Sequence, residues 1–516
     1  SDSGRRSQFP LPAFMAEPTS SQPLRRRALP RWAAILGIAV SSIPTAVVVL
    51  AFPVANFWVE SQWKNLQTQW ESEGESLQIE SILGPVPSDH ENFAHAPLIA
   101  EYLRQGPALS TDHAHGHDHS HSGDDHANYR EVSGRLGQLD LFGSGALTYP
   151  TPKPPLVFAT GQPVDLGIYV NPQVRSNRNE NLASLRQTFE PIAPLIDELM
   201  EAARLPEAHY PINLETPSAT QLPHLSALIP ALHAIRVHNL LLVESGAESA
   251  ETAARQLADT LRLIRHGTQS DGLASFSVRT MALESGGLEP VWQALMRQRF
   301  NDEQWQAIES ELRAFEFGPR LLHSLRFERA ALVREVENGF ERRSARPFSV
   351  PPAWVRLAGL MEYAAMTQRY WFTDGASGRP LVNGPQLPQL AAIEQHAASL
   401  EPSLGNMVMT LGVLPVHDFA VKARWVESQR DHALIAIAIE RFRLANDVLP
   451  ENLNALTPDF LSEIPTQVSN HEFPRFEDLN VLGESGPRKV GYQLRSFGED
   501  GESDGPGWIM PVGSIR

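Results

Sequence analysis

The sequence predicts a mainly α-helical protein that has one N-terminal transmembrane helix, an α-helical ectodomain and a small C-terminal α/β element. Three observations lead to this fold class. Residues 33–52 carry no charge, apolar side chains recur at helical spacing in residues 179–343, and residues 423–516 combine a helix with strand-like and glycine-rich pieces. A helical period of apolar residues predicts amphipathic helices, and about 20 apolar residues span one bilayer.

Changes in composition and periodicity divide the chain into segments. Stretches rich in proline, glycine and serine predict linkers, whereas periodic apolar stretches predict packed helices. The segments are a disordered cytoplasmic tail (1–31), the transmembrane helix (32–53), a juxtamembrane helix and strap (54–111), a histidine-rich loop (112–128), a connector rich in proline and glycine with short strands (129–178), a helical domain (179–343), an irregular helical segment (344–422), and a C-terminal helix with a small sheet (423–516).

Residues 33–52 are the predicted membrane anchor. Arg25, Arg26, Arg27 and Arg31 stand just before them, so the positive-inside rule leaves the N-terminus in the cytoplasm. The bulk of the chain is then periplasmic, behind a single span of a bacterial inner membrane. A cleaved signal peptide is the alternative, but its apolar region would measure about 7 to 15 residues and end in an A-x-A-like site. The segment is longer and lacks such a site, so we favour an uncleaved signal anchor.

Charge and cysteine content exclude several classes of function. The formal charge of the chain is −17, and residues 1–31 contribute +4 from six arginines and two acidic residues, which leaves −21 for the rest. An ectodomain this acidic argues against nucleic acid or anionic lipid as a partner of its bulk. Because the chain has no cysteine, disulfides, thiolate metal sites and a thiol nucleophile are excluded.

The histidine-rich loop has the most unusual composition in the chain. Imidazole and carboxylate groups bind Zn²⁺, Ni²⁺ or Cu²⁺, and histidines at alternate positions of a flexible loop bind a metal in several equivalent combinations. Two interpretations stay open: capture of divalent metal ions, and a solvent-exposed low-complexity insertion whose metal affinity is incidental. The candidate ligands are His113, His115, His117, His119, His121 and His126.

Residues 179–343 predict a helical domain whose short connections make neighbouring helices antiparallel hairpins. Residues 247–266 alternate small and large apolar side chains as in TPR-like arrays, but the TPR consensus of roughly 34 residues does not repeat. We therefore expect helical hairpins in a TPR-like array or an irregular bundle, with Ser249 and Asn301 as helix caps. The expected helices cover residues 181–204, 222–244, 248–266, 276–299, 302–315 and 318–339.

Further elements are expected on both sides of this domain. Gly74 is expected to interrupt the juxtamembrane helix. Residues 156–159 and 164–170 predict short strands in the connector. The additional expected helices cover residues 57–77, 354–371, 389–400 and 423–446.

Two groups of polar residues in the helical domain have a structural explanation beside a functional one. His224, His233 and His238 share one helix, but the last two are five residues apart, which does not stack side chains on one face. We favour structural histidines over a metal site. A second group of charges predicts a solvated or ion-paired helix face in preference to a catalytic acid pair. Its members are Glu328, Arg329, Arg334, Glu335 and Glu337.

The C-terminal segment has a distinctive order of elements. A helix at residues 423–446 is followed by DVLPENLNALTPDFL and, from residue 491, by GYQLRSFGEDGESDG. This order of helix, short capped helix, strand and acidic glycine loop locally resembles the C-terminal part of the type II secretion major pseudopilins. The resemblance implies a small sheet and a calcium-holding loop. Oxygen ligands at alternate positions suit Ca²⁺, with a solvated turn as the alternative. The candidate ligands are Asp500, Glu502 and Asp504.

A wider resemblance covers residues 57–516. It is carried by the order of GESLQIESILGPVPSDHENFAHAPL, TLRLIRHGTQSDGLASFSVRTMALES, LRFERAALVREVENG, ERFRLANDVLPENLNAL and LRSFGEDGESDG. This set resembles an uncharacterised family of single-pass bacterial envelope proteins. The resemblance implies the architecture and assigns no functional residue, and the histidine-rich loop is an insertion relative to its pattern.

No motif of a known chemistry stands in the sequence: the P-loop, the dinucleotide-binding glycine motif, the HExxH motif and the nucleophile elbow are all absent. This disfavours an enzyme, although a carboxylate pair leaves no motif. Our leading hypothesis is a non-catalytic, membrane-anchored periplasmic protein that serves as an interaction or scaffold component of a bacterial envelope assembly. It would bind other envelope proteins through grooves between helix pairs. The alternatives are divalent-metal capture by the histidine-rich loop and an envelope hydrolase with an unrecognised carboxylate pair.

Overall fold

The computed structural model describes most of the chain after residue 52. The expected transmembrane segment, the histidine-rich loop and the acidic glycine loop lie outside the described residues. The described residues are 53–105, 134–139, 141, 166–170, 177–214, 217, 222–269, 271–338, 353–373, 381, 385–401, 403, 406–465, 475–483, 486–495 and 508–511.

The chain consists of two compact units, Ser1–Val59 and Glu60–Arg516. In the first unit, residues 53–59 are helical and expose the large apolar side chains of Val54, Phe57 and Trp58. The second unit contains all other described elements. It is mainly α-helical, which confirms the fold class at this level.

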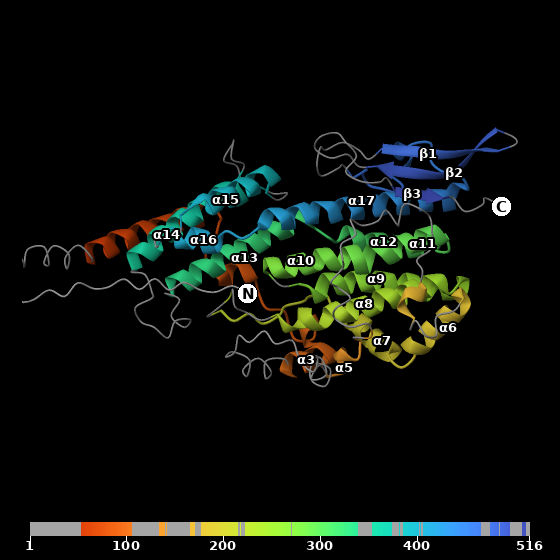
Figure 1. Cartoon of the computed structure of the whole chain (residues 1–516), viewed down its shortest axis with the longest axis horizontal. Helices are drawn as coiled ribbons and strands as arrows, with labels where there is room; N and C mark the ends of the chain where they lie inside the picture. Colours follow the sequence, from red (N-terminus) through yellow and green to blue (C-terminus); the bar gives the residue numbers. More distant parts are fainter. Residues whose placement is uncertain are drawn as a thin grey trace, which may run out of the picture. The chain divides into compact units, whose positions relative to one another are not determined.

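Helices form the body of the second unit (Figure 1). Residues 60–72 are helical as well. The α-helices are α2 (Ile79–Leu83), α3 (Pro97–Gln105), α5 (Gly134–Gly137), α6 (Arg178–Phe189), α7 (Ala193–Ala202), α8 (Pro223–Glu244), α9 (Ala250–Gly267), α10 (Leu273–Ala282), α11 (Glu289–Arg297), α12 (Asp302–Arg313), α13 (Gly318–Glu337), α14 (Ala353–Thr367), α15 (Leu387–Ser399), α16 (Met407–Gly412) and α17 (Val416–Asn446). Shorter 3-10 or π segments are η1 (Phe93–His95), η5 (Leu166–Tyr169), η7 (Ala247–Ser249), η8 (Leu283–Leu288), η9 (Gln368–Phe372) and η10 (Leu453–Leu456).

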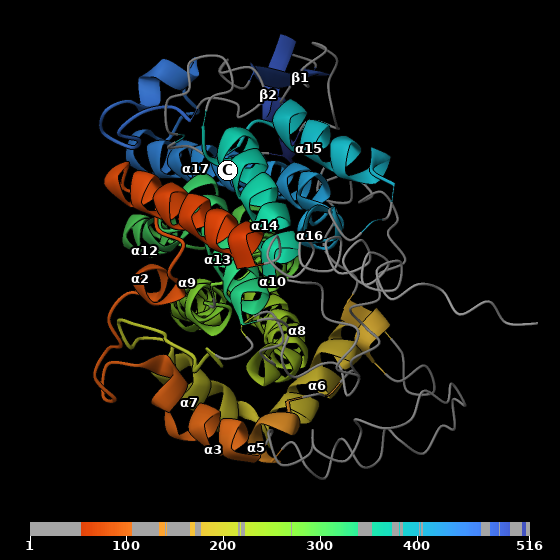
Figure 2. The same ribbon diagram turned by 90° about the vertical axis from the view of Figure 1, so that its left-hand side faces the viewer.

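The helices of the second unit pack in layers. Helix α9 lies between α8 and α12, and α17 runs across α10, α11 and α12 (Figures 1 and 2). Helices α14 and α16 pack together on α13, and α15 packs on α17. A continuous apolar core joins these layers and contains the buried rings of Trp292, Trp305 and Trp371. Short connections make α8 and α9 an antiparallel pair, as expected from the sequence.

One helix within the described residues is long and apolar enough to cross a membrane. It is the Ala227–Glu244 part of α8, and most of it is buried inside the second unit. Its apolar residues therefore belong to the protein core. The N-terminal segment expected to span the membrane lies outside the described residues and stays a prediction.

The observed helix ends can be compared with the expected caps and the expected break. Asn301 forms a capping box at the start of α12: its side chain accepts from the backbone N–H of Gln304, whose side chain accepts from the backbone N–H of Asn301. Gly74 adopts φ +84° just after the helix that ends at residue 72, so this break is confirmed. Ser249 occupies the N-cap position of α9, but its side chain makes no capping hydrogen bond. Its hydroxyl donates to the carbonyl oxygens of Leu242 and Gly246, at 2.9 and 2.8 Å, in the turn before α9.

Two expected helices are each divided. Residues 181–204 form α6 and α7, which are separated near Pro191, where proline removes a backbone donor. Residues 276–299 form α10, the π segment η8 and α11. A Cβ atom on Gly287 would lie 2.8 Å from the Cδ2 atom of Leu261, so glycine permits the close approach of η8 to α9.

The described part of the connector is helical, whereas the C-terminal region contains a β-sheet. The strand expected at residues 164–170 is wrong, because residues 166–169 form η5, which packs on α6 and α8 without a strand partner. Residues 156–159 lie outside the described residues.

The C-terminal sheet has three antiparallel strands in the order β1 (Arg475–Gly483), β2 (Gly486–Arg495) and β3 (Trp508–Pro511). Tyr492 and Leu494 of β2 join the main core.

Candidate functional site

Charged residues of α13 contact the strap, which we define as residues 60–83. Arg334 pairs with Glu80, and Glu337 accepts a hydrogen bond of 2.6 Å from Trp63 Nε1. The expected ion-paired face is therefore present at Arg334. Arg329 is also ion-paired, with Glu75, but its side chain is completely buried and not on a solvated face. These partners lie more than 250 positions away in the sequence, so helical spacing alone did not reveal them.

The most buried of these contacts form the Glu75 cluster, which consists of Glu75, Arg326 and Arg329. Arg326 donates to both carboxylate oxygens of Glu75 at 2.7 and 3.1 Å, and Arg329 Nη2 donates to Oε2 at 3.0 Å. The second Nη atom of Arg329 donates to Gln368 at 2.7 Å, and its guanidinium lies 4.1 Å from the ring centroid of Phe372. The cluster thus joins the strap, α13 and the segment after α14.

Burial and neighbouring charge act in opposite directions on this cluster. Burial raises the pKa of the Glu75 carboxyl, but the hydrogen bonds and charges of Arg326 and Arg329 outweigh it, so the pKa lies below its ordinary value. Burial lowers the pKa of Arg329 to about 10, and the charge of Glu75 opposes that shift. Both groups are charged at neutral pH. The Glu75 carboxylate therefore compensates a guanidinium that has no access to water.

Apolar packing supplements these charges. Ile79 of α2 is buried against Phe327, Ala330 and Ala331 of α13 in a small core of its own. Full burial of an isoleucine side chain stabilises a fold by about 1.5 to 3 kcal/mol. The strap is thus held on α13 by both charge pairing and apolar contact.

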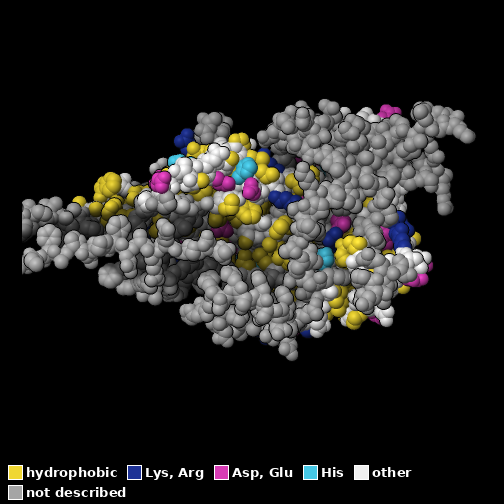
Figure 3. All heavy atoms as spheres, viewed as in Figure 1, with side chains coloured by type: hydrophobic (Ala, Val, Ile, Leu, Met, Phe, Trp, Pro, Cys, Tyr) yellow, Lys and Arg dark blue, Asp and Glu magenta, His cyan; other side chains and the backbone are white. Residues whose placement is uncertain are grey.

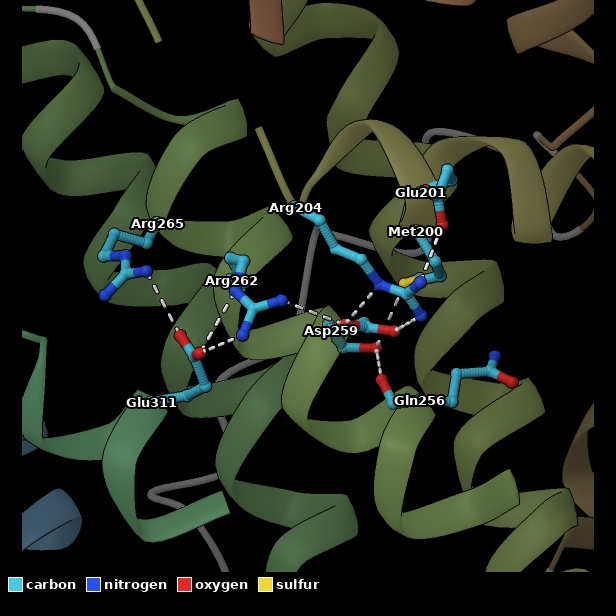
Figure 4. A network of polar contacts seen from close by, with 9 residues as sticks. Met200, Glu201, Arg204, Gln256, Asp259, Arg262, Arg265 and Glu311 are labelled. Carbon is cyan, nitrogen blue, oxygen red and sulfur yellow. Dashed lines mark hydrogen bonds and ion pairs between the residues drawn. The ribbon is translucent and has the colours of Figure 1, made fainter. Parts of the chain in front are cut away.

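A second polar network joins α7, α9 and α12 (Figure 4). Asp259 of α9 binds Arg204 at 2.7 Å and Arg262 at 3.2 Å. Arg262 also pairs with Glu311 of α12, and Arg265 reaches the same carboxylate at 3.2 Å. The sequence analysis missed this network, because its members are dispersed over three helices. Its charges alternate in sign, which is typical of a structural ion-pair network.

The hydrolase hypothesis requires a pair of carboxylic acids, and α17 offers one. Glu427 and Asp431 stand one helical turn apart, and burial raises the pKa of both, that of Glu427 to about 7. Arg430 lies between them, at 2.7 Å from Asp431 and 3.6 Å from Glu427. Both acids thus face one guanidinium on their own helix instead of facing each other across a cleft, as glycoside hydrolysis requires.

The three histidines of α8 have different surroundings. His224 stacks on Tyr210 with ring centroids 3.6 Å apart, and the Nδ1 atom of His238 lies 2.7 Å from Gln256. His233 packs edge-on against Tyr169. Burial lowers the pKa of His224 to about 3 and those of His233 and His238 to about 4, so all three are neutral at pH 7. The structure does not bring them together as a set of metal ligands.

The two predicted metal sites fall outside the described residues. These are the histidine-rich loop with His113, His115, His117, His119, His121 and His126, and the acidic loop with Asp500, Glu502 and Asp504. Within the part of the chain that the structure describes, no group of three or more histidine, aspartate or glutamate side chains is arranged to hold a metal ion. Zn²⁺, Ni²⁺ or Cu²⁺ at the first loop and Ca²⁺ at the second stay predictions.

No protein-family model, no curated protein and no solved structure matches this chain. The likeness to major pseudopilins and to single-pass envelope proteins therefore stays a prediction. The functional argument rests on the contacts described above.

Proposed function

We propose that this chain is a non-catalytic, membrane-anchored scaffold of the bacterial envelope, with a helical periplasmic body that binds other envelope proteins. The observation that carries the proposal is the attachment of the strap to α13 through the Glu75 cluster. A domain that only has to stay attached to the membrane can be connected to its anchor by a flexible linker. A scaffold, in contrast, must hold its binding surface in a defined position. The buried charges of the Glu75 cluster fix the strap on α13, which is consistent with a scaffold.

The start of the described chain supports membrane anchoring. Val54, Phe57 and Trp58 are 66%, 76% and 60% exposed on the helix that directly follows the uncharged residues 33–52. Large apolar side chains are rarely clustered on a surface facing water, and tryptophan is typical of the membrane interface. A bilayer boundary accounts for these side chains.

The surface of the second unit offers a place for a protein partner. Apolar and charged side chains are interspersed over the described part of the face in Figure 3. Two exposed apolar residues, Met281 of α10 and Val421 of α17, lie on helices that pack together. Beside them, Lys422 of α17 pairs with Glu284 of η8 at 2.6 Å. Mixed surfaces of this kind are usual in protein interfaces.

Site-specific photo-crosslinking in living cells tests the proposal. A photoreactive amino acid at Met281 of the full-length protein is expected to give discrete crosslinked products with other envelope proteins, and the same group at the exposed Glu251 serves as the control. Glu75→Gln is expected to reduce the Met281 products, and Glu80→Gln is expected to preserve them. A wild-type protein that stays monomeric in detergent and crosslinks to nothing would contradict the proposal.

A further inference from the structure

Three charged side chains of α17 form a compact group, which we name the α17 triad. Arg430 donates to Oδ1 of Asp431 through Nε at 2.9 Å and through Nη2 at 2.7 Å. The same Nη2 atom lies 3.6 Å from a carboxylate oxygen of Glu427, which is too far for a hydrogen bond. Glu427 is therefore the less compensated of the two acids.

The α17 triad holds two acids and one base in surroundings that are largely closed to water. The side chains of Glu427, Arg430 and Asp431 are 21%, 13% and 12% exposed. If both acids were ionised, the triad would carry one net negative charge, and burying an uncompensated charge is costly. Uptake of one proton makes the triad neutral. Because Glu427 has the weaker contact with Arg430, the geometry favours Glu427 as the acid that takes up this proton.

Neighbouring cations compensate the α17 triad only in part. Among the residues that the structure describes, Arg313 of α12 is the group whose charge reaches the triad from another element, and it binds Glu309 at 2.7 Å. Arg424, which precedes Glu427 by one turn of α17, donates to the backbone oxygen of Pro385 at 3.3 Å. Both arginines thus attract the carboxylates of the triad while they are held by partners of their own.

Other charged groups on the elements that pack on α17 have partners outside the triad. These pairs are Lys422 with Glu284 of η8, Arg236 with Glu289 of α11, Glu244 with Arg297 of α11, Arg441 with Asp302 of α12, and the backbone N–H of His417 with Glu394 of α15. Arg279 of α10 lies over the ring of Phe315, with its guanidinium carbon 5.2 Å from the ring centroid. The net charge of the triad therefore depends mainly on its own proton.

These surroundings place the titration of Glu427 near neutral pH. Burial raises the pKa of Glu427 to about 7; the charge of Arg430 opposes this shift, and the charge of Asp431 reinforces it. Burial also raises the pKa of Asp431, against the charge and the hydrogen bond of Arg430. Glu427 therefore gains or loses its proton close to pH 7.

Arg430 also holds the connection between α12 and α13 against α17. Its Nη1 atom donates to the backbone oxygen of Phe315, and its guanidinium carbon lies 5.6 Å from the ring centroid of Phe317. Phe315 and Phe317 lie in the short connection that separates α12 from α13, and both side chains are buried. A movement of this one guanidinium therefore affects the contacts of three helices.

We propose that the α17 triad is a proton switch that controls how firmly α17 holds the α12–α13 connection. With Glu427 protonated, Arg430 keeps the contacts with Asp431 and Phe315 that are present in the structure. Loss of the proton to the solvent leaves Glu427 charged, and a charged carboxylate attracts the Nη2 atom from 3.6 Å to hydrogen-bonding distance. Because the guanidinium is rigid and planar, this movement weakens its bond to Phe315. The connection is held firmly at acidic pH and is loosened above neutral pH.

Urea unfolding of the full-length protein in detergent at a pH of about 5.5 and of about 8.5 tests whether Glu427 is the proton-binding group. Because folding raises the pKa of Glu427 from 4.5 to about 7, the stability that its proton provides is complete at a pH below 4.5 and is lost as the pH rises through about 7. Glu427→Gln imitates the protonated acid at every pH. Relative to this variant, the folding equilibrium constant of the wild type is expected to fall by at least about tenfold between the two pH values.

Two further variants complete this measurement. Glu251→Gln, on the exposed face of α9, is the charge-matched control and is expected to keep the pH dependence of the wild type. Asp431→Asn leaves Arg430 available to Glu427, so the midpoint of the pH-dependent loss is expected to move to lower pH. An identical pH dependence in Glu427→Gln and the wild type would overturn the proposal. A midpoint that Asp431→Asn does not lower would equally contradict it, because the two acids would then not compete for Arg430.

Hydrogen exchange followed by mass spectrometry tests the structural consequence. After correction for the intrinsic effect of pH on exchange, peptides that cover residues 314–321 are expected to lose protection between a pH of about 6 and of about 8 in the wild type and to keep it in Glu427→Gln. Peptides from α3, which packs on α5, η1 and α8, serve as the internal reference and are expected to stay unchanged. An equal loss of protection in both proteins, or the same loss in α3, would show a general loosening and overturn the switch.

Discussion

The middle and the N-terminal end of α13 differ in the surroundings of their positive charges. Near the middle of the helix, Arg326 and Arg329 both pair with the carboxylate of Glu75, which is part of the strap. At the N-terminal end lies the arginine cluster, which consists of Arg279, Arg320 and Arg265. Burial, followed by the charges of Arg320 and Arg265, lowers the pKa of Arg279. Charge that the fold itself compensates becomes a structural link. Like charges that lie close together repel one another and reduce stability.

The largest effect is expected from a substitution that breaks the Glu75 cluster. Glu75→Gln keeps the side-chain volume but leaves the buried Arg329 without its counter-charge, and removing one partner of a buried ion pair typically costs about 3 to 5 kcal/mol. We expect a loss of about 3 kcal/mol in the free energy of unfolding, measured by denaturant unfolding of the full-length protein. A loss below about 1 kcal/mol would mean that water reaches Arg329 and that the cluster is not a structural link.

Acidification is expected to have the next largest effect, and to act on His266, beside Arg265 and Arg279, before it acts on the Glu75 cluster. Burial, followed by the charges of Arg265 and Arg279, lowers the pKa of His266 from 6.5 to about 4. As pH falls from about 6.5 to about 4, the unfolded chain takes up a proton that the folded chain does not, so stability is lost in this window. The pKa of Glu75 in the folded chain lies below its ordinary value. The stability that Glu75 contributes is therefore lost only at more acidic pH, when its carboxyl becomes protonated in the folded chain.

Comparison of urea unfolding at pH 7 and at pH 4.5 measures this effect. His266→Gln is expected to reduce the loss of stability between the two pH values by about 2 kcal/mol. Other buried histidines contribute in the same direction, so the difference between variant and wild type is the relevant quantity. An identical pH dependence in the two proteins would show that His266 is protonated equally in the folded and unfolded chains.

A smaller effect is expected at Arg279. Arg279→Gln removes the charge that Arg320 and Arg265 repel and is expected to stabilise the protein by up to about 1 kcal/mol. This sign is opposite to that of Glu75→Gln, although both substitutions remove one charge. Thermal unfolding at low ionic strength measures the change. A clear loss of stability would place Arg279 among the structural charges and remove the contrast between the middle of α13 and its N-terminal end.

The smallest effect is expected at the edge of the strap. The pair of Glu80 with Arg334 is exposed, by 51% and 35%, so Glu80→Gln is expected to change stability by less than about 1 kcal/mol. The same unfolding measurement applies, and Glu80→Gln also serves as the charge-matched control for Glu75→Gln. A loss as large as that of Glu75→Gln would show that attachment of the strap depends on its total charge and not on burial.

Local signals in the sequence predicted local structure well. The helices at 222–244, 302–315 and 318–339 were expected within a few residues, and the Asn301 cap and the Gly74 break are present. These features depend on residues within one or two helical turns. The strand expected at residues 164–170 failed because a short apolar run fits a strand or a packed 3-10 turn equally well, and contact with α6 and α8 decides between them.

The sites were less predictable than the helices. The sequence showed charges at helical spacing on residues 328–337, yet the buried status of Arg329 depends on Glu75, whose position is 254 residues away. The arginine cluster drew no attention at all, since Arg265, Arg279 and Arg320 belong to three helices with no shared motif. Conversely, the histidine-rich loop was conspicuous in the sequence and lies outside the described residues.

The sequence by itself determined the helical class, most helix boundaries, the uncharged N-terminal segment and the exclusion of cysteine chemistry, because each of these follows from composition or from neighbours along the chain. Only the tertiary structure decided which charges are compensated. Whether a charge is buried and paired depends on which distant helix packs against it, and helical periodicity carries no information about that partner. The difference between the Glu75 cluster and the arginine cluster arises from packing alone.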